Sequence, residues 1–230
     1  MDNPDDIDTI EIVVYDGFDE LDAIGPYEVF RNAADFDRDV SVDLVTLDPR
    51  ERVTASHGLA VEPDGTLGED PDLVVVPGGG WNDSGGGSDD RPPAGARAEA
   101  ERGDLPAALR ERADRGSAMA AVCTGGMLLA EAGLLDGRPA VTHAGALVDL
   151  RATGAQVVDA RVVDAAGRGP ASSETRSRDE VDVLTAGGVT SGLDLAFHVV
   201  EQVWDGAVAD RVATEMEYDR RADVHVADDT

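Results

Sequence analysis

Hydrophobic positions along the chain alternate between a strand period and a helix period. Short runs of aliphatic and β-branched residues predict strands at 9–15, 40–48, 71–80, 117–122, 138–145, 155–164 and 181–188. Apolar residues at helical spacing predict helices at 19–33, 104–116, 124–132 and 146–154, and one long or two consecutive helices at 189–218. A short extended excursion is expected at 56–64. Strands that alternate with helices favour an α/β fold, a mostly parallel sheet covered on both faces.

Two polar stretches interrupt this pattern. Residues 81–103 and 165–180 are dominated by Gly, Asp, Pro, Ser and Arg, and we expect both to be surface insertions without regular structure. The remaining pattern fits a single domain over residues 9–218, since a chain of 230 residues with 42% hydrophobic residues can bury a full core. Residues 1–8 and 219–230 are expected to be solvated tails.

The charge balance is strongly acidic. The chain has 48 acidic and 19 basic residues, a net charge of -29, and every basic residue is Arg. Such a charge repels itself in dilute buffer, whereas molar salt shortens the screening length to about 3 Å. We therefore interpret the chain as a protein of a halophile that accumulates salt. A surface this acidic repels phosphate, which argues against nucleic acid or an anionic membrane as a partner.

The cysteine content and the lack of long apolar runs exclude several kinds of protein. One cysteine excludes an intramolecular disulfide and a zinc site built from several cysteines. The first ten residues have no basic or apolar leader pattern, and no run approaches 18 apolar residues. These observations predict a cytoplasmic protein.

Several unusual residues lie where predicted strands end. Asp22 follows the first strand, Gly78–Gly80 follow the third, Cys123 follows "SAMAAV", His143 ends the next strand, and Gly187–Gly188 follow the last. Ligands of parallel sheets bind outside the carboxyl ends of the strands. This edge is therefore the predicted site.

Cys123 lies between small residues, in the order Ala121, Val122, Cys123, Thr124, Gly125. A nucleophile on a sharp strand-to-helix turn needs such neighbours, because the backbone segments approach closely there. A helix N-terminus favours thiolate, so we expect the thiol to have a pKa below its usual value of about 8.5. The amides of Thr124 and of the Gly78–Gly80 loop are candidate anion donors. The alternative is an inert, buried cysteine.

Four blocks of sequence resemble the ThiJ/PfpI superfamily, and within it the isonitrile hydratase branch. They are "YDGFDELDAIGPYEVF" at 15–30, "VVVPGGG" at 74–80, "AVCTGGMLLAEAGLLDGRPAVTH" at 121–143, and the segment at 184–218 that begins "LTAGGVTSGLDLAFHVV". The resemblance covers residues 10–218. It implies a flavodoxin-like, doubly wound sheet, a homodimer, a small-molecule substrate, and no metal or organic cofactor.

The resemblance also implies roles for individual residues. Cys123 matches the family's nucleophile and Thr124 the residue after it. Asp22, in "LDAIGP", matches the acid that faces the sulfur, and Gly79 and Gly80 match the loop that supplies an oxyanion amide. From its position alone, without the resemblance, Asp22 reads as an ordinary carboxylate at a helix start.

Some residues depart from the patterns of related enzymes. Thr124 stands where protease members have His, and no late His-x-Glu pair of the glutamine amidotransferases is present. Ala144 stands where isonitrile hydratases tend to have Trp, which implies a more open pocket. His143 is either a substrate-binding residue or a strand-end histidine satisfied by backbone, and His198, among apolar helix residues, is expected to be structural.

The resemblance implies a cysteine-dependent hydratase in which Cys123 attacks an isonitrile carbon and Asp22, kept partly protonated by burial, transfers protons. Thr124 would orient the intermediate. Two alternatives stay open. One is a glyoxalase or deglycase activity on reactive carbonyls, which normally uses Glu where Asp22 stands, and the other is a non-catalytic sensor of a ligand or of oxidation.

The acidic composition generates a prediction about salt. If the charge is a halophilic adaptation, the melting temperature should rise steeply between about 0.1 M and several molar KCl, because screening removes self-repulsion. Thermal unfolding followed by circular dichroism across a KCl series measures this. A melting temperature that is indifferent to KCl would refute the interpretation.

Overall fold

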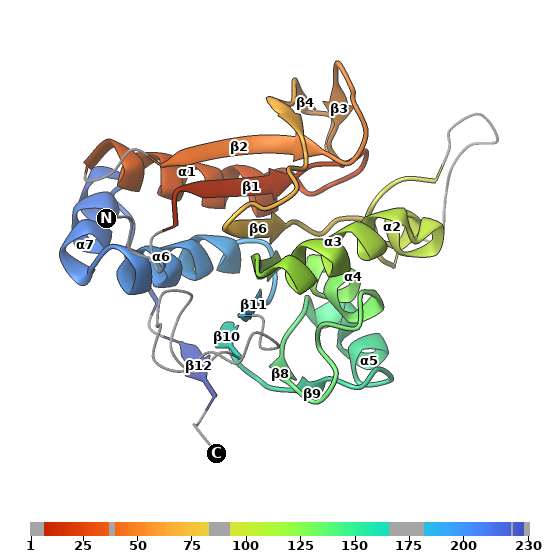
Figure 1. Cartoon of the computed structure of the whole chain (residues 1–230). Helices are drawn as coiled ribbons and strands as arrows, with labels where there is room; N and C mark the ends of the chain where they lie inside the picture. Colours follow the sequence, from red (N-terminus) through yellow and green to blue (C-terminus); the bar gives the residue numbers. More distant parts are fainter. Residues whose placement is uncertain (1–6, 37–39, 83–92, 166–181, 222, 228–230) are drawn as a thin grey trace.

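The computed structural model describes residues 7–36, 40–82, 93–165, 182–221 and 223–227. An eight-stranded sheet runs through the molecule in the order β12-β10-β11-β7-β6-β1-β2-β5 (Figure 1). Its strands are β1 (Thr9–Val13), β2 (Ser41–Thr46), β5 (Gly65–Thr66), β6 (Leu73–Val76), β7 (Ala118–Val122), β10 (Val162–Asp164), β11 (Val183–Ala186) and β12 (Val224–Val226).

The sheet is mostly parallel, as the sequence predicts. Every neighbouring pair is parallel except β10 with β11. All residues of β6 and β7 are buried, because helices cover both faces of the sheet at its centre. Strands in that position read as continuous apolar runs, which is how "LVVV" and "AMAAV" stand in the sequence.

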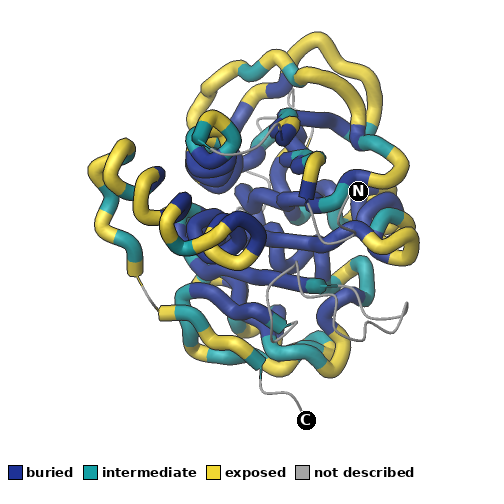
Figure 2. Tube along the Cα trace, turned by 60° about the vertical axis from the view of Figure 1, so that its left-hand side comes forward, coloured by how far each residue is buried: buried dark blue, intermediate teal, exposed yellow. Residues whose placement is uncertain are grey.

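Helices cover the sheet in two groups. On one side, α1 (Glu20–Phe36), α6 (Ser191–Val203) and α7 (Gly206–Glu215) pack against one another. On the other, α2 (Ala96–Arg102), α3 (Asp104–Arg115) and α4 (Gly125–Glu131) form a second group, with α5 (Leu147–Leu150) close to α4 in the view of Figure 1. Figure 2 shows that the centre of the molecule is buried and that the outer turns are exposed. The predicted α/β class is therefore confirmed.

The prediction of an irregular insertion at 81–103 is wrong in its second half. Residues 96–102 form α2, which ends at the left-handed Gly103 and buries Ala96, Ala98 and Glu99. "ARAEAER" is rich in good helix formers, but its buried side chains are too small for apolar periodicity to be visible. Residues 83–92, and residues 166–180 of the second insertion, lie outside the described residues.

Two predicted strands and one predicted helix are shorter than expected. The segment 138–145 contains only β8 (Pro139–Ala140), which pairs with β9 (Gln156–Val157) outside the main sheet. The predicted strand 155–164 is thus divided into β9 and β10, and the predicted helix 146–154 is reduced to α5 after the 3-10 turn Ala144–Ala146. The apolar pattern of these segments shows that they can form strands, but the available pairing partners decide which residues do so and in which sheet.

Three further segments depart from the expected outline. The excursion at 56–64 belongs to a hairpin of β3 (Val53–Thr54) and β4 (Ala60–Val61). The tails are not wholly solvated, because Ile7 is buried in the core and β12 adds to the sheet beside β10. Among the described residues, no helix is both long and apolar enough to cross a membrane.

Candidate active site

Cys123 lies directly after β7, at the carboxyl edge of the sheet. Its φ is 59°, a left-handed value that residues other than glycine rarely adopt. Its N–H is held by the carbonyl oxygens of Ala186 (3.1 Å) and Gly187 (2.8 Å), at the end of the neighbouring strand β11. The strained conformation is therefore stabilised by the adjacent strand, and Cys123 is buried, with 6% of the residue exposed.

Two glycines allow the turn to form. A Cβ on Gly125 would lie 2.0 Å from the carbonyl oxygen of Val76, and one on Gly78 would lie 2.4 Å from the nitrogen of Thr124. The end of β6 and the first turn of α4 therefore touch backbone to backbone. The close approach predicted from the small residues around Cys123 is present, and its partner is the β6 exit.

Asp22 is fully buried in the first turn of α1 and interacts with the Cys123 side chain. Its Oδ2 accepts a hydrogen bond from the N–H of Gly78 at 3.0 Å. Burial and then the charge of Asp19 raise the pKa of Asp22 to about 8, while the hydrogen bonds from Gly78 and Cys123 lower it. This carboxyl therefore holds its proton at neutral pH.

The expected low pKa of the cysteine is wrong. Burial, followed by the charge of Asp22, raises the pKa of the Cys123 thiol to about 12. The backbone N–H groups of Thr124 and Val189 interact with the sulfur and lower its pKa, as a helix N-terminus should. Their effect on the pKa is smaller than that of desolvation. The prediction failed because the sequence does not reveal how deeply the sulfur is buried.

The glycine loop after β6 differs in part from its predicted role. The N–H of Gly79 donates to Thr124 Oγ1 at 2.9 Å, and that of Gly78 is bound to Asp22. Both amides therefore position side chains of the site instead of facing an incoming anion. The N–H of Gly80, whose φ is 55°, has no acceptor among the described residues.

His143 lies beside the site in a capping position. Its Nδ1 accepts from the N–H of Gly145 at 3.1 Å and so caps the 3-10 turn. Its own backbone N–H donates to the Cys123 carbonyl oxygen at 3.4 Å, next to a 2.8 Å hydrogen bond from Thr142 Oγ1 to the same oxygen. Of the two interpretations of His143, a histidine whose ring is bound to backbone therefore holds for its Nδ1.

Tyr15, Val189 and Thr142 are site residues that the sequence analysis missed. The buried Tyr15 hydroxyl donates to the Pro77 carbonyl oxygen at 2.6 Å. In the sequence, Tyr15 reads as the last residue of a buried strand and Val189 as a helix start, so neither carries a signal of its own. His198, by contrast, pairs with the buried Asp164 at 2.9 Å, which agrees with its expected structural role.

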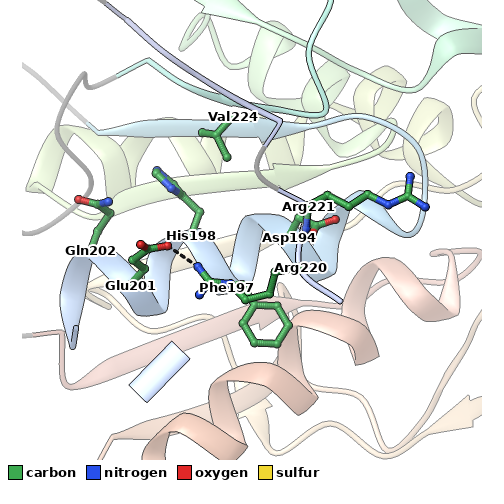
Figure 3. A pocket seen from close by; sticks show the side chains of 8 residues that line it. All are labelled: Asp194, Phe197, His198, Glu201, Gln202, Arg220, Arg221 and Val224. Carbon is green, nitrogen blue, oxygen red and sulfur yellow. Dashed lines mark hydrogen bonds and ion pairs between the residues drawn. The ribbon is translucent and has the colours of Figure 1, made fainter. Parts of the chain in front are cut away.

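A separate cavity of about 270 Å³ lies along α6 (Figure 3). Its lining residues are Asp194, Phe197, His198, Glu201, Gln202, Arg220, Arg221 and Val224. The predicted site residues are absent from this lining. Asp194 is held by Arg161 and by the Tyr218 hydroxyl, and Arg220 is paired with Glu201, so the charges around this cavity compensate one another.

A cysteine on a strained strand-to-helix turn, facing a buried acid at the edge of a parallel sheet, defines the class of this protein. The chain belongs to the DJ-1/PfpI family, whose model matches residues 8–202.

Known proteins with similar sequences and structures agree with this assignment. An isonitrile hydratase of Pseudomonas putida is 32% identical over 212 residues, which cover 91% of this chain and 78% of the relative. The Parkinson disease protein 7 homolog of Danio rerio is 25% identical over 207 residues, covering 87% and 92%. The crystal structure of a ThiJ/PfpI family protein from Pseudomonas syringae has a TM-score of 0.72 at 27% identity, covering 93% and 76%.

The close approach at Gly125 predicts a large loss of stability on substitution. Gly125→Ala should lower the free energy of unfolding by about 3 kcal/mol or more, because a backbone oxygen occupies the space of the new methyl group. Gly65→Ala is the matched control, since that site is open, and it should change stability by less than about 0.5 kcal/mol. Urea unfolding at one fixed KCl concentration compares them, and equal effects would contradict the close packing.

The raised pKa of Asp22 predicts a pH-dependent stability difference. The folded chain keeps a proton on Asp22 that the unfolded chain releases above about pH 4. The stabilising contribution of this proton is full below about pH 4 and is lost as the pH rises to about 8. Asp22→Asn should therefore gain stability relative to the parent across this window, whereas exposed Asp48→Asn should not. Urea unfolding from pH 4.5 to 8.5 tests this, and a constant difference would contradict it.

Proposed function

We propose that this protein adds water to an isonitrile and releases an N-substituted formamide. The observation that carries the proposal is the buried Asp22 carboxyl, which holds its proton at neutral pH and interacts with the Cys123 thiol. The 32% identity to an isonitrile hydratase supports the choice of substrate class.

The first step needs an acid and a nucleophile together. Asp22 donates its proton to the terminal isonitrile carbon, which makes that carbon electrophilic, and the sulfur of Cys123 bonds to it. The thiol proton passes to the carboxylate that Asp22 has become, so the carboxyl is restored and the product is an S-linked thioimidate. A thiol with a pKa of about 12 suits this order, because its proton leaves only as the carbon–sulfur bond forms.

The second step is hydrolysis of the thioimidate. Asp22 protonates the imidate nitrogen and takes a proton from the attacking water, which gives a tetrahedral carbon that bears oxygen, nitrogen and sulfur. Collapse breaks the carbon–sulfur bond, returns a proton to Cys123 and releases the formamide. Proton and atom balance is complete with water as the only co-reactant, so the proposal includes no metal or organic cofactor.

Thr124 organises the site around these groups. Its backbone N–H interacts with the sulfur, while its hydroxyl accepts from Gly79 and thereby ties the β6 loop to the start of α4. We assign it the orientation of the intermediate, with the N–H of Gly80, which has no acceptor among the described residues, as a candidate donor to a developing negative charge. We also propose that two copies of this chain form a homodimer.

The proposal predicts graded losses of turnover. Cys123→Ala should abolish formamide formation, and Asp22→Asn should lower kcat by about 10²–10⁴, since it removes proton transfer and keeps the shape. Thr124→Ala should lower kcat by about tenfold, whereas Thr124→Ser keeps the hydroxyl and should stay close to the parent.

Assays of formamide release in molar KCl, with methylglyoxal as the competing substrate class, measure these effects. The parent rate should fall as the pH rises through about 8, because Asp22 then loses the proton that it donates. Cys123-dependent turnover of methylglyoxal but not of isonitriles would move the protein to the glyoxalase alternative. Turnover of neither substrate would favour the sensor.

A further inference from the structure

Two consecutive peptide groups after β6 are each hydrogen-bonded on both sides. In the Pro77–Gly78 peptide, the carbonyl oxygen accepts from the Tyr15 hydroxyl at 2.6 Å, and the N–H donates to Asp22 Oδ2 at 3.0 Å. One amide plane therefore connects Tyr15 to Asp22.

The next peptide, Gly78–Gly79, repeats the arrangement with a different outer partner. Its carbonyl oxygen accepts from the backbone N–H of Asp19 at 2.8 Å, and its N–H donates to Thr124 Oγ1 at 2.9 Å. Both acceptors beyond these peptides are side chains of the candidate site. Only the peptide that binds Asp22 has a side chain, that of Tyr15, as the donor to its carbonyl oxygen. A substitution of Tyr15 can therefore remove this donor without changing the backbone.

We propose that Tyr15 is a positioning residue that sets the acidity of Asp22 through the Pro77–Gly78 peptide. The inference rests on the proposed role of Asp22 as the proton donor and deepens it. A peptide whose oxygen accepts a hydrogen bond is polarised, and its N–H becomes a stronger donor. A stronger donor favours the charged carboxylate over the neutral acid.

The surroundings make Asp22 sensitive to this single contact. Its second oxygen, Oδ1, is buried and has no hydrogen-bond partner of strict geometry among the described residues. The titratable groups that shift the pKa of Asp22 are Asp19 and Cys123. The charges that raise the pKa of Tyr15 are those of Asp22, Glu99, Cys123 and Asp19. Burial raises the pKa of Tyr15 well above 10, so its phenol remains a donor throughout the range in which Asp22 titrates.

Tyr15→Phe removes the hydroxyl and keeps the ring in the core. Asp22 should then titrate about half a pH unit higher than in the parent, because the Gly78 donor is weakened. Carboxyl-carbon NMR of aspartate-labelled protein measures this directly, with the Asp22 signal assigned by its absence from Asp22→Asn. Tyr27→Phe, a half-buried tyrosine of α1, is the matched control and should leave the Asp22 titration unchanged.

A second substitution tests the sign. Site-specific 3-fluorotyrosine at position 15 is nearly isosteric and has a more acidic phenol, so it should donate more strongly and lower the Asp22 pKa. A purely structural tyrosine would not move the two variants in opposite directions. Unchanged Asp22 titration in both variants, with folded spectra, would overturn the inference.

The pH profile of turnover provides the link to catalysis. If the proposed hydration occurs, the alkaline limb of kcat should move with the Asp22 pKa in both variants. If the NMR shifts occur without any isonitrile turnover, the proposed function fails while the Tyr15 assignment stands. If turnover occurs and the alkaline limb and the NMR pKa stay fixed, only the Tyr15 assignment fails.

Discussion

The direct contact between the end of β6 and the start of α4 is the constraint on which the site depends. Gly78 and Gly125 let two backbones meet at distances that no Cβ permits. That contact brings the Gly78 N–H to Asp22 and the Gly79 N–H to Thr124, while β11 holds Cys123 in its strained conformation. The acid, the thiol and the amides are therefore positioned by backbone, which is the most rigid support a site can have.

The same packing sets the electrostatics. Removing water from Asp22 and Cys123 raises both pKa values, so the site holds two neutral acids at pH 7 instead of a carboxylate or a thiolate. A neutral carboxyl can donate a proton, and a neutral thiol beside it can lose one in exchange. Chemistry that begins with substrate protonation suits such a site better than chemistry that begins with a free thiolate.

The charges of the acidic surface and those of the buried site respond differently to salt. Most carboxylates of the described residues are exposed or half-buried, and exposed ion pairs such as Arg110 with Asp114 contribute about 0–1 kcal/mol each. Salt screens that surface, but a charge removed from water responds mainly to its immediate neighbours. Stability should therefore depend on salt much more strongly than the ionisation of Asp22 does.

The sequence by itself determined the fold class, the order of the central strands and helices, and the residues at the carboxyl edge, because apolar periodicity and strand-end glycines are local signals. Cys123, Thr124 and Asp22 were found in this way together with the family resemblance. Only the tertiary structure decided the depth of burial, which reversed the expected pKa of Cys123, and the hydrogen-bond partners, which occupied the Gly79 amide and revealed Tyr15. It also decided that 96–102 is a helix and that 224–226 is a strand. Desolvation and pairing are sums over neighbours distant in the chain, so no local pattern encodes them.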